Sequence, residues 1–194
     1  MFVADLRHFL DMPDDAPGPA RRMAEHLTLI VRAATSGDAG FEWVSGLPCR
    51  RRPGRTACPG HLAVFRADVP PTIDWRCTSC GDEGVIRGWE RSPYDLRTRS
   101  AEQLPGDSLR VVVAPAVATT LRGLLLVDRA SERLVFRARH TDDGIELGGD
   151  DEDLDALIEA VAAEAGQETD RRRRKRLDDA FAALEDAVEH AERP

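Results

Sequence analysis

Four cysteines are the residues of this chain whose type and spacing could carry chemistry. The 194 residues contain no other cysteine, and the four lie close together in the sequence, at Cys49, Cys58, Cys77 and Cys80. Zn²⁺ prefers four ligands arranged as a tetrahedron, and thiolate sulfur suits it well. Cys77-Thr78-Ser79-Cys80-Gly81 is an ordinary Cys-x-x-Cys turn, and its glycine tolerates a positive φ. The sequence therefore predicts one structural zinc ion.

The first pair of cysteines is spaced differently, because eight residues separate Cys49 from Cys58. Cys58-Pro59-Gly60-His61 is itself a Cys-x-x-His sequence, so His61 could replace Cys49 as the fourth ligand. A third interpretation has no metal, with the cysteines as disulfides or as a free thiol pair. The sequence favours four cysteine ligands and leaves the other two interpretations open.

The N-terminal residues determine which cellular compartment we expect. Met1 to His8 lacks the basic segment followed by an apolar segment that a signal peptide requires. The longest apolar stretches, such as Leu124 to Val127, are too short to span a bilayer. We expect a cytoplasmic protein with no membrane partner. Thiols stay reduced in the cytoplasm, which favours a metal over disulfides.

The cysteine pairs alternate with short apolar stretches that are typical of strands, at Phe41–Val44, Leu62–Arg66, Ile73–Arg76 and Val85–Trp89. A ligand pair, two antiparallel strands, a second ligand pair and a further strand resemble the zinc-ribbon family. The resemblance covers residues 41–91. It implies a fold and a bound zinc ion, and it implies no particular activity.

The rest of the chain predicts an α+β protein. Residues 1–40 are expected to form two helices, over 3–12 and from Pro19 to about Ser36. Residues 92–107 are polar and are predicted to be a linker. Residues 108–194 are predicted to form an antiparallel β-meander, including Leu134–Arg139, closed by two helices that begin near Asp151 and Thr169. Thr120–Val127 fits either a strand or the end of a helix.

Charge is distributed unevenly along the chain. The net charge is −8, yet residues 49–99 carry ten basic and six acidic side chains. Residues 50–57, which we call the arginine loop, hold four of these basic residues: Arg50, Arg51, Arg52 and Arg55. A loop fixed at both ends by zinc ligands would present guanidinium groups to an acidic partner. The alternative is a solvated loop that pairs with acidic residues of its own chain.

Two further features have more than one interpretation. Trp75 and Trp89 could stack on nucleic-acid bases, but they are more simply explained as the core of a small β unit. Arg171–Arg176 could bind an anionic partner. Neutralisation by solvent or within the chain is favoured, for example by the acidic residues of Asp150–Asp155 if the two helices form a hairpin.

The function predicted from the sequence is that of a small zinc-binding adaptor or regulator without catalytic activity. A protein partner is expected at the arginine loop, and a nucleic acid is the runner-up. The sequence shows no glycine-rich phosphate loop and no Gly-x-Ser-x-Gly nucleophile turn, so no residue is predicted to be catalytic. An enzyme with a structural zinc is a second alternative, and no small-molecule ligand is indicated.

Overall fold

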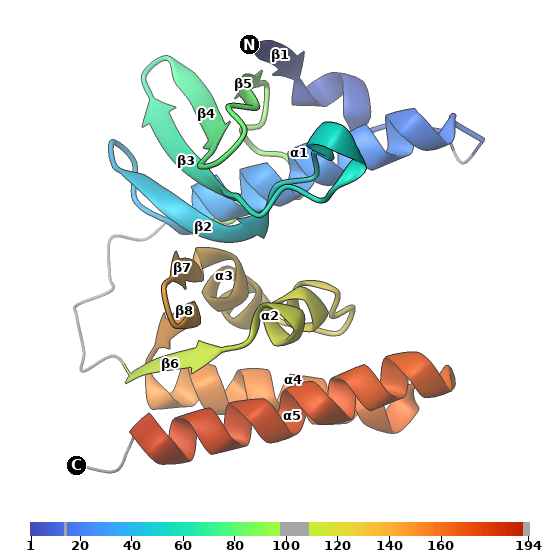
Figure 1. Ribbon diagram of the computed structural model, residues 1–194, viewed down its shortest axis with the longest axis vertical. Helices are drawn as coiled ribbons and strands as arrows, with labels where there is room; N and C mark the ends of the chain where they lie inside the picture. The colour runs from blue at the N-terminus through green and yellow to red at the C-terminus, as the bar shows by residue number, and fades with distance from the viewer. Residues whose placement is uncertain (14, 98–108, 192–194) are drawn as a thin grey trace. The chain divides into compact units, whose positions relative to one another are not determined.

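The computed structural model describes residues 1–13, 15–97 and 109–191 (Figure 1). The chain divides into two compact units, Met1–Thr98 and Arg99–Pro194. Each unit contains both helices and strands, which confirms the predicted α+β class. Of the predicted linker, residues 98–107 lie outside the described residues, whereas residues 92–97 are part of the first unit.

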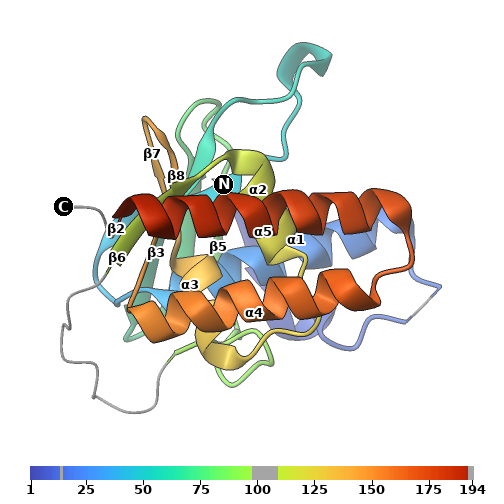
Figure 2. The same cartoon turned by 90° about the horizontal axis from the view of Figure 1, so that it is seen from below.

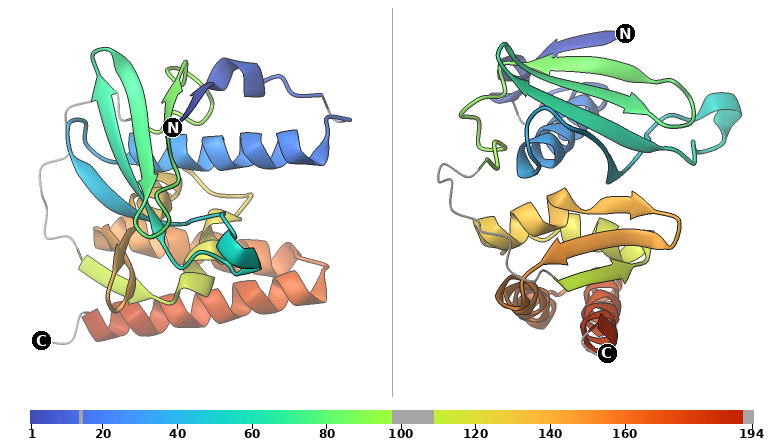
Figure 3. Two further views of the ribbon diagram at one scale, coloured as in Figure 1. Left: turned by 45° about the horizontal axis from the view of Figure 1, so that its top comes forward. Right: turned by 90° about the vertical axis from the view of Figure 1, so that its left-hand side faces the viewer.

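The first unit is a five-stranded sheet with one long helix on one face. The strands are ordered β1-β5-β4-β3-β2, and neighbours are antiparallel except β1 and β5, which are parallel. Their bounds are β1 Phe2–Asp5, β2 Glu42–Pro48, β3 His61–Asp68, β4 Pro71–Cys77 and β5 Glu83–Arg87. The four strands predicted between residues 41 and 89 are therefore confirmed, with shifted ends. Helix α1, Gly18–Ser36, runs across the sheet (Figure 3, left).

Helix α1 is fixed at both ends by identifiable residues. Pro19 occupies its first turn, where a missing backbone N–H costs nothing. Its apolar face buries Leu27, Ile30 and Val31 against the sheet. At the other end, the guanidinium of Arg66 on β3 donates to the carbonyl oxygens of Ala34 and Gly37, at 3.0 and 2.7 Å. These are carbonyls that the end of a helix leaves without an intrahelical partner.

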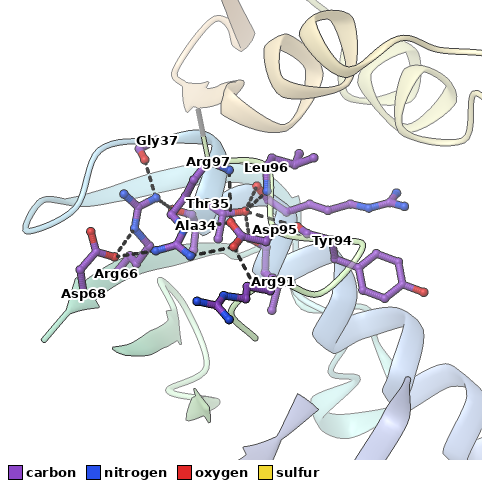
Figure 4. Close-up of polar contacts among 12 residues, drawn as sticks. Ala34, Thr35, Gly37, Arg66, Asp68, Arg91, Tyr94, Asp95, Leu96 and Arg97 are labelled. Atoms are coloured by element: carbon purple, nitrogen blue, oxygen red, sulfur yellow. Dashed lines mark hydrogen bonds and ion pairs between the residues drawn. The ribbon is translucent and has the colours of Figure 1, made fainter. Parts of the chain in front are cut away.

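The Arg66 side chain is also part of a wider polar network (Figure 4). Arg66 pairs with Asp68, and Asp68 pairs in turn with Arg97. Arg97 forms a second ion pair with Asp95 and lies 4.5 Å from the ring centre of Trp89. These contacts bind the segment up to residue 97 to β3 and, through Arg66, to the end of α1.

The helix predicted over residues 3–12 is wrong. The structure has strand β1, Phe2–Asp5, followed by a single 3-10 turn, η1, Leu6–Phe9. A helix of about ten residues is marginal on its own in water. The free edge of β5 supplies a better partner, because Phe2 pairs with Gly84 and Ala4 with Ile86. Leu6, which the predicted helix also buried, remains fully buried in the 3-10 turn.

In its described residues, 109–191, the second unit has three antiparallel strands in the order β7-β8-β6, and four helices. The strands are β6 Leu109–Val113, β7 Arg139–Thr141 and β8 Gly144–Gly149, and the first two helices are α2 Pro115–Arg122 and α3 Arg129–Arg137. The predicted strand Leu134–Arg139 is wrong and the meander is interrupted, because α3 occupies most of that segment. Asp128 caps α3 by accepting from the amides of Ala130 and Ser131, and its apolar face buries Leu134 and Val135.

The two closing helices are confirmed as α4, Asp151–Gln167, and α5, Arg171–Ala191. They run side by side as an antiparallel hairpin (Figure 2) and are seen nearly end-on below the strands in Figure 3, right. Asp150 caps α4, and Asp170, not the predicted Thr169, caps α5 by accepting from the Arg173 amide at 2.7 Å. None of the described helices is long and apolar enough to cross a membrane.

Candidate metal centre

The four cysteines lie at the ends of four strands of the first unit. Cys49 follows β2, Cys58 precedes β3, Cys77 is the last residue of β4, and Cys80 precedes β5. The antiparallel pairing of β3 with β4 places Leu62 opposite Cys77, so the two turns meet at one edge of the sheet. The backbone bond from the Cys49 amide to the Gly60 carbonyl, 2.8 Å, brings the first cysteine to the same place.

The sulfur positions fit one tetrahedral ion. The four Sγ atoms lie within 4.8 Å of one another. The Cys49–Cys80 and Cys58–Cys77 pairs are each separated by 3.7 Å. Ligands about 2.3 Å from a zinc ion form a tetrahedron with edges of about 3.8 Å. A disulfide requires about 2.05 Å between sulfurs, so the observed pairs are free thiols. The donor set is that of one structural zinc site.

Backbone amides point at the sulfurs on both turns. The amides of Arg51 and Gly60 lie 3.4 and 3.5 Å from the sulfurs of Cys49 and Cys58. On the second turn, the amides of Ser79 and Cys80 lie 3.3 and 3.5 Å from the Cys77 sulfur. An N–H donor stabilises a thiolate more than a thiol, so both turns favour the charged form that binds metal.

The thiols cannot all ionise on their own at neutral pH. Burial raises the pKa of Cys49 to about 12. Burial also acts to raise the pKa of Cys77, but hydrogen bonds from the amides of Cys80 and Ser79 and from the thiols of Cys49 and Cys80 together lower it to about 7. Placing four thiolates in so small a volume requires a compensating positive charge. A divalent cation provides this charge, which is why the residues present fit zinc.

The group of side chains close enough to share an ion consists of the four cysteines and does not include His61. The His61 backbone instead joins the two turns, since its amide donates to Thr78 Oγ1 at 3.1 Å and its carbonyl accepts from the Thr78 amide at 2.9 Å. Four sulfur ligands leave no coordination position for a substrate, so zinc here supplies folding energy and not catalysis.

Gly60 is a residue of the site that reasoning from the sequence missed. A Cβ at this position would lie 2.6 Å from the Cys77 sulfur and 2.8 Å from the Ser79 side chain. Only glycine lets the two turns pack this closely. The only signal in the sequence is that Gly60 follows Cys58 by two residues. Its close approach to Cys77 and Ser79 depends on the tertiary fold. Gly81, by contrast, has the positive φ expected from the sequence, 70°.

The arginine loop is closed by the site at both ends. Besides the two cysteines, the Cys58 amide donates to the Arg51 carbonyl at 2.9 Å, and the 3-10 turn η2, Pro53–Arg55, forms the tip. Figure 2 shows this turn extending away from the sheet of the first unit. The loop is exposed from Arg50 to Ala57.

The four arginines of the loop differ in their surroundings. Arg50 lies against Met23 of α1, with 3.3 Å between Nη2 and Sδ, and Arg51 forms a long ion pair with Asp82 at 3.9 Å. Within the described part of the chain, the side chains of Arg52 and Arg55 have no hydrogen-bond or ion-pair partner. These two guanidiniums are therefore the ones available to a partner.

The two tryptophans that flank the second turn are buried. Trp75 is 3% exposed and Trp89 is fully buried, so neither offers a face for base stacking. Trp75 packs against the edge of the His26 ring of α1, with 5.4 Å between ring centres. Both residues belong to the core of the first unit, as the simpler interpretation of the sequence held.

The basic run Arg171–Arg176 is neutralised in part within the chain, as the sequence favoured, but by other residues than the suggested Asp150–Asp155. In the antiparallel hairpin, this basic run lies beside the end of α4, about 20 Å along the helix from its acidic start. Arg173 instead pairs with Glu164 and Glu168 and donates to the Gly123 carbonyl at 3.1 Å. Arg171 and Arg172 are exposed.

Comparison of the chain with protein-family models, with curated proteins and with solved structures gives no match. The assignment of the four-cysteine cluster as a metal site therefore rests on its geometry alone, and no family is recognised.

Proposed function

We propose that this protein is a zinc-stabilised adaptor or regulator that binds an acidic protein partner through the arginine loop of a ribbon-like zinc unit. One observation carries the proposal: the loop is held at both ends by zinc-site cysteines, while Arg52 and Arg55 are exposed and without a partner in the described residues. A loop held in this way loses little conformational freedom on binding, so less of the binding energy is spent on ordering it.

Nucleic acid is the second candidate partner. Guanidinium groups bind phosphates as well as carboxylates, and residues 49–99 carry ten basic and six acidic side chains in a chain whose net charge is −8. The acidic remainder repels a polyanion, and the buried tryptophans remove the stacking surface that single-strand binding uses. A protein partner that presents carboxylates locally is favoured for these reasons.

The proposal is tested with Arg52→Glu/Arg55→Glu. A photo-crosslinking amino acid placed at Thr56 in cells identifies what the loop touches, and the crosslinked peptides are sequenced. We expect crosslinks to carboxylate-rich protein segments that disappear in the double variant. Arg171→Glu/Arg172→Glu on α5 makes the same charge change in the second unit and should retain them. Acidic residues suit the first turn of a helix, so this control should fold.

Fluorescence anisotropy with single- and double-stranded oligonucleotides separates the two candidates. Binding that weakens with salt and is abolished by Arg52→Glu/Arg55→Glu would assign the loop to nucleic acid. Crosslinks and oligonucleotide binding that are both insensitive to the loop arginines would overturn the proposed role of the loop.

A further inference from the structure

The face of the first sheet opposite α1 carries an aspartate near its middle. Trp75 on β4 packs against His26 of α1, so Asp74, the residue before it, points to the opposite face. On that face, Asp74 lies between Phe65 of β3 and Val85 of β5. Asp74 is half-buried, and strands disfavour aspartate. The needs of the sheet therefore do not explain why this residue stands on its middle strand.

The arginines on the same face do not neutralise Asp74. Arg76, two residues along the same strand, is held by Glu42 through hydrogen bonds of 2.7 and 3.0 Å. Arg87, two residues beyond Val85 on β5, points to this face and is exposed. Within the described part of the chain, the Asp74 carboxylate has no hydrogen-bond or ion-pair partner, Arg87 included. Burial raises the pKa of Asp74 above its usual value.

A pocket of about 140 Å³ is lined by Asp74 and by neighbouring residues of strands β2 to β5. Its apolar lining includes Phe65 and Val85. Glu83, which also lines it, lies 4.0 Å from the Met1 amino group. Among the described residues of this pocket, Asp74 is thus the carboxylate without a partner. Sites for cofactors and drug-sized ligands usually measure about 300–1,000 Å³, so this pocket has room for a single side chain.

We propose that this pocket binds an arginine side chain of a basic protein partner. The Asp74 carboxylate accepts two hydrogen bonds from the guanidinium, whose planar fork matches its geometry. Phe65 and Val85 offer apolar surface to the guanidinium plane and to the aliphatic stem. The net charge of −8 attracts a basic partner over longer distances. The site does not include the arginine loop, so it is independent of the function proposed above.

A cationic side chain suits the pocket better than a metal ion. Calcium and magnesium require about six or more oxygen ligands, and the group of described side chains placed to share an ion is the four-cysteine cluster. A carboxylate removed from water costs free energy unless a partner compensates it. A bound guanidinium supplies that partner. Asp74 therefore has the property expected of a binding residue, because it lowers the stability of the free protein and is compensated in the complex.

Nuclear magnetic resonance of the zinc-loaded full chain tests the proposal, with N-acetyl-arginine methylamide as the probe. Titration should shift the amide signals of Phe65, Asp74 and Val85. The citrulline analogue, which has nearly the same shape and no charge, should bind roughly tenfold more weakly or not at all. Asp74→Asn should weaken arginine binding by a similar factor. Asp11→Asn removes an exposed charge outside the pocket and should leave binding unchanged.

Melting temperatures separate lost binding from lost structure. Asp74→Asn should melt at the wild-type temperature or above it, since it removes a half-buried charge that has no partner in the described residues. Asp74→Thr introduces a residue that strands prefer, so it should be more stable than wild type and equally unable to bind arginine. Lower melting temperatures in both variants would show that Asp74 supports the fold and would overturn the proposal.

Three binding results would also overturn it. The first is a set of arginine-induced shifts that persists in Asp74→Asn. The second is citrulline binding as tight as that of arginine, which would show that the charge is not recognised. The third is free arginine that binds more tightly than the blocked form, which would assign the pocket to a free amino acid and not to a protein partner.

Discussion

At the scale of single residues, the zinc site combines three buried cysteines with one exposed cysteine, Cys80. Cys49, Cys58 and Cys77 are each less than a tenth exposed. The buried sulfurs are set by the strands that carry them, whereas Cys80 depends on the tight turn closed by Gly81. The contribution of each residue to metal binding is therefore separable by substitution.

Replacing Cys77 or Cys80 by serine should remove zinc from the purified protein. A hydroxyl is a poor substitute for a thiolate, and structural zinc contributes on the order of 10–16 kcal/mol to such units. Metal content per chain by mass spectrometry should fall well below one in either variant, together with yield of folded protein. His61→Ala, whose side chain is outside the cluster, should keep one zinc per chain. Stoichiometric zinc in the double cysteine variant would show that the cluster is not the site.

His26 should make the first unit sensitive to mild acid. Burial, and to a lesser degree the charge of Arg50, lowers the pKa of His26 to about 4 in the folded protein. The unfolded chain binds this proton near pH 6.5, so stability is full above that pH and is lost as pH falls toward 4. Between pH 7 and pH 5 the loss due to His26 is about 2 kcal/mol.

The measurement is urea unfolding at pH 7 and pH 5 for wild type and for His26→Phe. The cysteines and carboxyl groups titrate alike in both proteins, so the difference between the two pH dependences isolates His26. The variant should lose about 2 kcal/mol less than wild type on acidification. Equal losses would mean that His26 is protonated without cost in the folded state.

At the scale of elements, the position of β1 depends on one glycine of its neighbour. A Cβ at Gly84 of β5 would lie 2.6 Å from the Phe2 carbonyl oxygen and 2.9 Å from Trp75 Nε1. Backbone cannot move as readily as the end of a flexible side chain. Any side chain at Gly84 must therefore push β1 away from the sheet.

Gly84→Ala should destabilise the first unit by roughly 1–3 kcal/mol, as overpacking of a tight core does. Amide hydrogen exchange should show faster exchange over Phe2–Asp5, because β1 loses its partner. Gly148→Ala is the matched control, since a Cβ there meets nothing within 4 Å. That control should be nearly neutral in urea unfolding. Equal stability of both variants would indicate that β1 is not held by β5.

The elements that sequence patterns predicted well are those whose own periodicity determines them. Helix α1 has a strong apolar face between a proline and a glycine, and the strands beside the cysteines are short apolar stretches between turn residues. The errors fall where another part of the chain decides the outcome. Strand β1 exists because β5 offers a free edge. Helix α3 was mistaken for a strand because residues 134–139 alternate between apolar residues on one side and Arg137 and Arg139 on the other. So short a pattern does not exclude a helix, and Leu134, Val135 and Phe136 are in fact all buried in one.

The candidate metal centre was predictable because the ligands are few and chemically distinctive. The sequence favoured Cys49 over His61 but left the choice open, because the position of Cys49 depends on the Cys49–Gly60 backbone bond that closes the arginine loop. The contacts of Arg50 and Arg51 could not be predicted from the sequence either. Their partners are distant along the chain, because Met23 lies on α1 and Asp82 follows the second turn.

At the scale of the whole molecule, the two units differ in what stabilises them. The first unit contains the cysteine cluster and all three tryptophans, Trp43, Trp75 and Trp89. The second unit has its own apolar core, which includes Leu147, Leu157 and Leu184, and it contains no cysteine. Loss of metal should therefore destabilise the first unit and not the second. A spectroscopic signal that comes from the first unit alone should report this loss.

A strong zinc chelator should red-shift the tryptophan emission, since the buried tryptophans of the first unit become exposed to water. The helical circular dichroism of α4 and α5 should largely persist, because their core does not depend on the metal. Adding zinc back under reducing conditions should restore the fluorescence. Simultaneous loss of both signals would show that the two units unfold as one.

The closed arginine loop also affects how long the chain survives in the presence of proteases. Trypsin-like enzymes cleave after arginine when the backbone can extend into their active site, and residues 50–57 contain four arginines in an exposed segment. With both cysteines on the metal and the Cys58–Arg51 bond in place, the loop is held in a bent form that such enzymes accept poorly. Without the metal, we expect the same residues to extend more readily and to be cleaved faster. The loop would then couple the lifetime of the protein to its metal content.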